Sequence, residues 1–180
     1  SFQVGDPQKI SNSVGIKVLS DFRNFDIALG GMGAPLVPFF HKYLYSEKEK
    51  NKLIFNIGGI ANGTYLNGEE ISLASDVGPG NCLMDLVASE RFNRPFDFNG
   101  EEASKGKAND VLLAKLLANC ANMEFPRADD KKDYYALMNE TSSIDSNSLI
   151  RTLAEFSAEM IKKFCNHCNN PKDIIFHGGG

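Results

Sequence analysis

Three short apolar runs follow one another between residues 52 and 77, and turn-forming residues separate them. The runs read "KLIFNIGG", "NGTYLN" and "EISLASDV" and are rich in β-branched and aromatic side chains. Asn67 and Gly68 stand between two of them, and this pair favours a type I′ turn, in which both central residues have positive φ. The pattern predicts consecutive antiparallel strands near residues 52–58, 62–67 and 70–77.

Apolar residues at helical spacing predict four helices. Residues 35–45 carry Pro35 in a first turn, and a second helix begins near Pro79 and has apolar residues up to Phe92. Residues 109–120 form a third, with Asn109 or Asp110 as its cap. The longest covers residues 147–168, and one apolar face contains Ile150, Leu153, Phe156, Met160, Ile161 and Phe164.

Two further strands are expected outside this central region. The segment "IKVLSDF" (residues 16–22) predicts a short strand, and "KDIIFHGGG" at the end predicts a buried strand that runs into glycines. Strand, hairpin, strand, helices and strand in this order are typical of a ribonuclease-H-like fold, in which antiparallel strands extend a parallel sheet. We therefore predict a partial α/β fold of this kind, a mixed sheet with flanking helices.

Composition excludes several classes of partner. The 180 residues are 42% hydrophobic and 23% charged, with a formal net charge of -4, and basic residues lie beside acidic ones. We expect neither a nucleic acid nor a membrane partner, since no basic stripe, signal peptide or apolar run of spanning length is present.

Four cysteines are spread without the spacing of a disulfide framework, which indicates a reducing compartment and a cytoplasmic protein. Cys165 and Cys168 form a lone CxxC, interpreted as thiols near a helix end; no metal site is predicted. The sequence begins "SFQVGDPQ", without Met, and ends on a strand, so we expect it to be part of a longer chain.

The candidate chemistry lies in residues 55–81, where two glycine-rich loops accompany Asp76, the acidic residue set just before the second loop. Locally, Gly58 and Gly59 are also compatible with a β-bulge or a tight turn, and Asp76 with a helix cap or turn aspartate. Local sequence alone leaves these alternatives open.

Five motifs in order resolve them in favour of a function. "VGDPQKI", "VLSDFRNFDIALGG", "GAPLVPFFHKYL", "NIGGIAN" and "DVGPGNCLMD", with the terminal "FHGGG", together resemble the 1,6-anhydro-N-acetylmuramic acid kinase family of the sugar kinase, Hsp70 and actin superfamily. The likeness covers nearly the whole chain, and is strongest over residues 5–100 and weakest over residues 119–147.

The resemblance implies a two-lobed kinase that uses ATP and Mg²⁺. Residues 1–51 would be the tail of the N-terminal lobe and residues 52–180 the first part of the C-terminal lobe. Asn56, Gly58 and Gly59 resemble the family's second phosphate loop, while its first, of Gly-Thr-Ser-x-Asp-Gly type, is absent from this sequence. The chain alone is therefore expected to be inactive. The resemblance assigns the loop that packs against adenosine to Gly178, Gly179 and Gly180.

Asp76 resembles the family's catalytic base, which activates the water that opens the 1,6-anhydro bridge while ATP phosphorylates O6. Arg23 is expected to pair with the lactyl carboxylate of the sugar, oriented by Asp21; a surface ion pair between these neighbours is the alternative. Asn81 is expected to hold its loop or a sugar hydroxyl. His41 is expected to be a packed or interface histidine.

Several positions depart from the family pattern. Val77 replaces Thr, Ser75 replaces an aromatic residue, and Gly63 replaces a β-branched residue; "FPRADDKKDYY" stands where the family has a Pro-Pro-Lys-Ser type segment.

The resemblance also implies a homodimer, for which the apolar helix "PLVPFFHKYLY" offers a surface. The alternatives to a kinase are a non-catalytic actin-like module that binds nucleotide and a protein that binds an acidic sugar without turnover.

Overall fold

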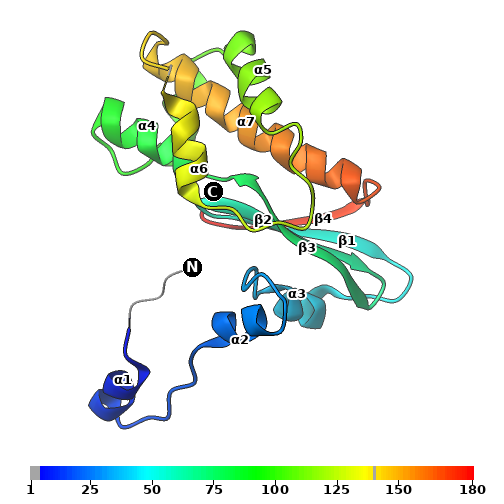
Figure 1. Cartoon of the computed structure of the whole chain (residues 1–180). Helices are drawn as coiled ribbons and strands as arrows, with labels where there is room; N and C mark the ends of the chain where they lie inside the picture. The colour runs from blue at the N-terminus through cyan, green and yellow to red at the C-terminus, as the bar shows by residue number, and fades with distance from the viewer. Residues whose placement is uncertain (1–4, 140) are drawn as a thin grey trace.

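The computed structural model describes residues 5–139 and 141–180, and its centre is a four-stranded mixed sheet (Figure 1). The strands are β1 (Asn51–Ile57), β2 (Ile60–Asn67), β3 (Glu70–Pro79) and β4 (Asp173–Gly178), in the order β3-β2-β1-β4. β1, β2 and β3 pair antiparallel, and β4 pairs parallel to β1. The three predicted hairpin strands and the predicted α/β class are confirmed, with bounds that differ by two residues or fewer.

One face of the sheet is covered by helices that follow β3 in the chain (Figure 1). These are α4 (Cys82–Phe92), α5 (Asp110–Asn119), α6 (Lys131–Tyr135) and α7 (Ser146–His167). Short 3₁₀ turns lie at Phe98–Gly100, Ala103–Lys105 and Ala136–Met138. α4 and α7 belong to the connection that returns the chain to β4 parallel to β1, as a parallel pair requires.

The packing of α7 explains why its apolar face is needed. Phe156 and Phe164 are fully buried, and the Phe164 ring meets Phe55 of β1 edge-on at a centroid distance of 5.8 Å. A Cβ added to Gly63 would lie 2.6 Å from the Phe164 ring. Gly63, expected from the sequence to depart from the family pattern, therefore makes room for an aromatic side chain on the facing helix.

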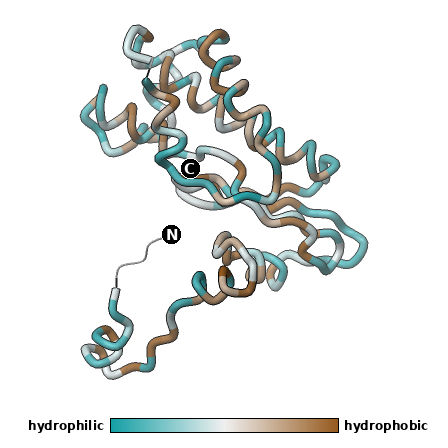
Figure 2. Tube along the Cα trace, in the orientation of Figure 1, coloured by the Kyte–Doolittle hydropathy of each residue, from teal (hydrophilic) through white to brown (hydrophobic). Residues whose placement is uncertain are grey.

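The N-terminal segment lies on the other side of the sheet and contains α1 (Pro7–Val14), α2 (Phe22–Ala28) and α3 (Pro38–Tyr45). α1 and α2 have no buried residue, although hydrophobic positions run along this segment as they do along the sheet and its helices (Figure 2). α3 is anchored by His41, which is 1% exposed and whose Nδ1 lies 2.9 Å from Thr64 Oγ1 of β2. His41 is thus packed, as expected.

Three predictions near element ends were wrong. Residues 16–21 form no strand, and α2 begins at Phe22, because this segment lies apart from the sheet and has no strand to pair with. The predicted helix at Pro35 begins at Pro38, which fills the first helical position. Pro79 ends β3 rather than starting α4, which begins at Cys82.

The hairpin turn and the last strand also differ from expectation. The central turn residues are Gly68 and Glu69, of which Gly68 alone has positive φ, so the turn is not type I′. β4 exists but is exposed rather than buried, because it is the edge strand next to β1: Phe176 is 56% exposed, even though its ring stacks on Phe55. The proposed division at residue 51 stays a prediction.

Candidate active site

Three glycine-bearing segments meet where β1 and β4 end. The Gly58 carbonyl accepts a hydrogen bond from the Asn81 N–H at 2.8 Å, and the Gly59 carbonyl accepts from the N–H groups of Gly80 and Cys82, both at 3.1 Å. The N–H groups of Gly179 and Gly180 donate to the Ile57 carbonyl at 3.1 Å. Segments far apart in the sequence are thus joined through their backbones into one cluster.

The close backbone approach explains why two of these positions are glycine. A Cβ on Gly80 would lie 2.1 Å from the Gly58 carbonyl oxygen, and one on Gly178 would lie 2.3 Å from the Ile57 carbonyl oxygen. Gly178 also has φ of +115°, a conformation that L side chains rarely adopt. These glycines fix the distances between the loops.

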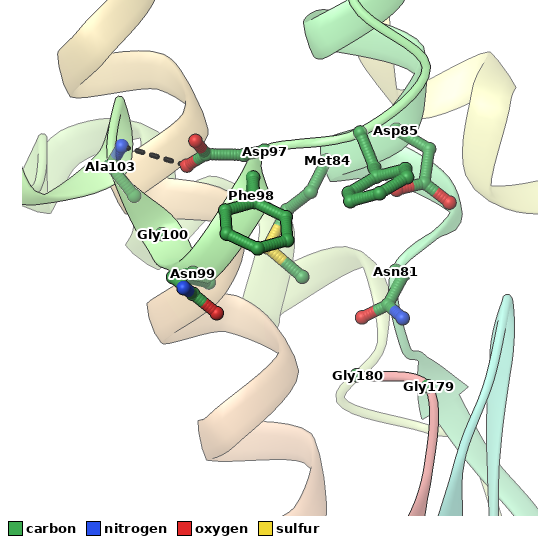
Figure 3. A pocket seen from close by; sticks show the side chains of 12 residues that line it. Asn81, Met84, Asp85, Asp97, Phe98, Asn99, Gly100, Ala103, Gly179 and Gly180 are labelled. Carbon is green, nitrogen blue, oxygen red and sulfur yellow. Dashed lines mark hydrogen bonds between the residues drawn. The ribbon is translucent and has the colours of Figure 1, made fainter.

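Two asparagines flank the cluster. Asn56 pairs with His177 across the β1–β4 ladder, and its Oδ1 would lie 2.8 Å from a Cβ added to Gly178. Asn81 precedes α4 without capping it through its side chain, which instead lies next to Gly180 (Figure 3).

A cavity of about 580 Å³ opens beside Gly179 and Gly180 (Figure 3). Its walls include Asn81, Asp85 and the aromatic side chains of Phe96 and Phe98. Burial raises the pKa of Asp85. The cavity combines apolar walls with a few polar groups, as small-molecule sites do.

Asp76 lies on β3, three residues before the strand ends at Pro79, and is 8% exposed. Its Oδ2 accepts a hydrogen bond from the Asp129 N–H at 2.9 Å. Burial is the main cause that raises the pKa of Asp76, and the Asp129 carboxylate adds to it, while Arg127 and Arg23 act in the opposite direction. A buried carboxylate with a raised pKa suits a general base.

The segment that the sequence marked only as a departure from the family holds Asp76 in place. Arg127 donates to the carbonyls of Asp76 at 3.3 Å and Val77 at 2.5 Å, and forms an ion pair with Asp129 at 3.1 Å. The Tyr134 hydroxyl donates to Asp129 Oδ2 at 2.5 Å. Ser75 accepts a hydrogen bond from the Arg127 N–H at 2.9 Å. This network fixes the edge of β3 on which Asp76 lies.

Removal of the Arg127 side chain is expected to destabilise a protein that carries this chain. Arg127→Ala would leave the Asp129 side chain, 9% exposed, without its cation, and breaking such a buried pair costs about 3 kcal/mol. The control is Arg151→Ala, which removes an exposed pair with Glu155 and should change the free energy of unfolding by about 0.5 kcal/mol or less. Urea unfolding of both variants measures the difference; equal losses would contradict the role given to Arg127.

The two polar residues expected at the sugar have separate partners. Arg23 of α2 donates to the Gly33 carbonyl at 2.5 Å, and its positive charge opposes the rise in the pKa of Asp76, so it lies within electrostatic reach of that carboxylate. Asp21 is exposed and accepts from Asn24 at 2.5 Å, so the structure places it beside Asn24 rather than beside Arg23.

Asn62 was missed by the sequence reasoning. It pairs with Asp76 on β3 and with Asn56 on β1, so the three residues form one row across the sheet, and its Oδ1 is buried without a hydrogen-bond partner among the described residues. The alternation of residues along β2 would have found it, had the register with β3 been known.

Neither a group of metal-ligating side chains nor a membrane-spanning helix is found in the described part of the chain. Within residues 5–139 and 141–180, no three His, Cys, Asp or Glu side chains are grouped to hold a metal ion. None of the helices described there combines the length and the apolar character needed to cross a membrane.

A mixed sheet flanked by helices, with glycine loops joined at its end, fits the fold of the sugar kinase and actin-like ATPase class. Comparison with known proteins specifies the family: the model for anhydro-N-acetylmuramic acid kinase matches residues 1–180, and the chain belongs to this family.

Curated relatives agree with this assignment. The chain is 38% identical over 187 residues to anhydro-N-acetylmuramic acid kinase of Shewanella putrefaciens. The aligned region covers 100% of this chain and 51% of the relative. The chain is also 38% identical over 184 residues to the protein of the same name from Gamma-proteobacterium EBAC31A08, covering 100% of this chain and 50% of the relative. The chain thus spans about half the length of these relatives.

Proposed function

We propose that a protein of the relatives' length that carries this chain is an ATP-dependent kinase. It converts 1,6-anhydro-N-acetylmuramic acid and water into N-acetylmuramic acid 6-phosphate, with release of ADP, in peptidoglycan recycling. The observation that carries the proposal is Asp76, a buried carboxylate on the strand that leads directly into the Gly80–Asn81 turn of the glycine cluster. At about 3.3 Å per residue, Asp76 lies about 13 Å along the chain from Gly80 in that turn.

Asp76 acts as the base for water attack at the anomeric carbon. It takes a proton from the water as the water oxygen bonds to C1, and the bond between C1 and the bridging oxygen breaks. The bridging oxygen becomes O6 and attacks the γ-phosphorus, so ADP leaves. Asp129 orients the carboxylate through its backbone N–H.

The glycine cluster holds the phosphates of the nucleotide. Because the Gly58 carbonyl points at Asn81, the Gly59 N–H of the same planar peptide points away from that turn, toward where a phosphate can approach. Asn56 supports this loop. Gly179 and Gly180 border the cavity that takes the adenosine, and Gly178, packed against the Ile57 carbonyl, holds this glycine segment in place. Mg²⁺, carried by the phosphates, neutralises their charge.

Arg23 pairs with the lactyl carboxylate of the sugar, and Asn81 binds a sugar hydroxyl or holds its loop. Asp21 contributes through the start of α2 rather than through a contact with Arg23, because its carboxylate bonds Asn24. These assignments are tested by Arg23→Lys, which keeps the charge but loses the fork that matches a carboxylate, and should raise the KM for the sugar more than it lowers kcat.

A non-catalytic module that binds nucleotide or an acidic sugar is the alternative. The two are separated by ADP release from ATP with and without the anhydro sugar. The kinase releases ADP only when the sugar is present; a binding module binds its ligand and releases none.

The raised pKa of Asp76 predicts where activity is lost at low pH. The base is active only when it is ionised, so kcat/KM falls as the pH falls through its pKa. Because burial raises this pKa, the loss of kcat/KM is expected at a pH above the ordinary Asp pKa of about 3.9. A pH profile of kcat/KM measures it. A limb at or below the ordinary value would assign the titration to another group.

We further propose that the protein is a cytoplasmic homodimer. Its four cysteines are free, as in a reducing compartment. On α3, Phe39 and Tyr43 are 78% and 84% exposed, and apolar surface of this kind supports association. Light scattering at high concentration should give twice the monomer mass, and a monomer would contradict the dimer.

A further inference from the structure

Lys131 lies directly over the proposed phosphate loop. It is the first residue of α6, and a Cβ added to Gly59 would lie 2.6 Å from its Nζ. The Gly59 carbonyl is held by Gly80 and Cys82, so the loop beneath the ammonium group is fixed. A cation and a bare glycine backbone thus face each other at the same point.

The charge of Lys131 reaches the rest of the cluster. Burial raises the pKa of Cys82 and of Asp85, which lines the cavity beside Gly180, and the positive charge of Lys131 opposes both rises. Yet Lys131 forms no ion pair within residues 5–139 and 141–180.

The acidic residues nearest in sequence are already engaged. Asp130 accepts from the Lys132 N–H at 3.0 Å, Asp133 accepts from the Asp130 N–H at 3.4 Å, and Asp129 is bound by Arg127 and Tyr134. The ammonium group therefore remains available to an anion that enters over Gly59.

We propose that Lys131 binds a phosphate group of the nucleoside triphosphate held at the loop of Gly58 and Gly59. The inference rests on the proposed nucleotide site and adds a side-chain cation to a loop that otherwise offers backbone donors. An ammonium group is a compact point charge that suits a phosphate oxygen. Residues 125–135, which stand in place of the family's Pro-Pro-Lys-Ser type segment, thus take part in binding the nucleotide.

The test compares Lys131→Gln with Lys132→Gln, the neighbouring exposed lysine, in a protein of the relatives' length that carries this chain. Calorimetry measures the Kd for ATP and for adenosine, which lacks phosphates. We expect Lys131→Gln to weaken ATP about ten-fold, as loss of a charged hydrogen bond does, with adenosine unchanged. Lys132→Gln should change neither Kd by more than about two-fold, and Lys131→Arg should restore part of the ATP affinity.

The outcomes separate this inference from the proposed function. Unchanged ATP affinity in Lys131→Gln, or equal weakening of ATP and adenosine, would overturn the role of Lys131 alone. A parent protein that binds no ATP would overturn the nucleotide site and Lys131 together.

Discussion

Replacement of Asp76 by Asn is expected to lower turnover of the anhydro sugar by about a hundred-fold or more, with little loss of nucleotide binding. Asn keeps the shape of the side chain and an oxygen that can accept from the Asp129 N–H, but it cannot take a proton from water. Steady-state phosphorylation measures turnover, and calorimetry measures ATP binding. Turnover within a few-fold of the parent would leave Asp76 a structural residue.

The Tm of Asp76→Asn serves as a control for damage to the fold. Burial raises the pKa of Asp76 in the folded protein above its value in the unfolded chain, so the ionised carboxylate lowers the free energy of unfolding. This loss of stability is complete at pH values above the folded pKa and absent at pH values below the unfolded pKa. Asp76→Asn should therefore raise the Tm at neutral pH, with a gain that shrinks toward pH values below about 4. A lower Tm at neutral pH would mean that lost turnover reflects damage to the fold.

Gly80→Ala is expected to disrupt the glycine cluster. The added Cβ would lie 2.1 Å from the Gly58 carbonyl oxygen, so the hydrogen bonds from residues 80–82 to Gly58 and Gly59 cannot all survive. We expect a loss of about 2 kcal/mol in the free energy of unfolding and at least about ten-fold weaker ATP binding.

Gly58→Ala is the matched comparison. Its Cβ would meet nothing closer than the Ile60 carbonyl oxygen, at 3.7 Å, and its φ is not in the positive range. The variant should keep its stability within about 0.5 kcal/mol and still bind ATP more weakly, because a methyl group would stand at the phosphate loop. Equal stabilities of the two variants would contradict the joining of the loops through Gly80.

Local patterning was enough to predict the central strands and α7. Their alternation and 3.6-residue spacing follow from which side chains are buried, and burial decides these elements. Residues 16–22 have an equally apolar pattern, but the segment has no neighbouring strand, so pairing rather than pattern decided against a strand. β4 was predicted as buried, since an apolar run does not reveal that its strand lies at an edge.

The candidate site was predictable only in part. The resemblance supplied Asp76 and the glycines, but the reason for Gly80 and Gly178 appears only when carbonyls from distant segments are seen against them. Arg127 lies about fifty residues from the Asp76 and Val77 carbonyls that it binds, and nothing local marks such a contact. The position of Lys131 over Gly59 likewise joins residues far apart in the sequence, so no local pattern predicts it.

Sugar-dependent release of ADP, with analysis of the sugar product, tests whether the protein phosphorylates and hydrates the anhydro sugar. A purified protein of the relatives' length that carries this chain is given ATP, Mg²⁺ and 1,6-anhydro-N-acetylmuramic acid, and the product is examined by mass spectrometry. We expect ADP release only with the sugar, and a product that has gained one phosphoryl group and one water. Equal ADP release without the sugar, or a sugar that returns unphosphorylated, would contradict this expectation.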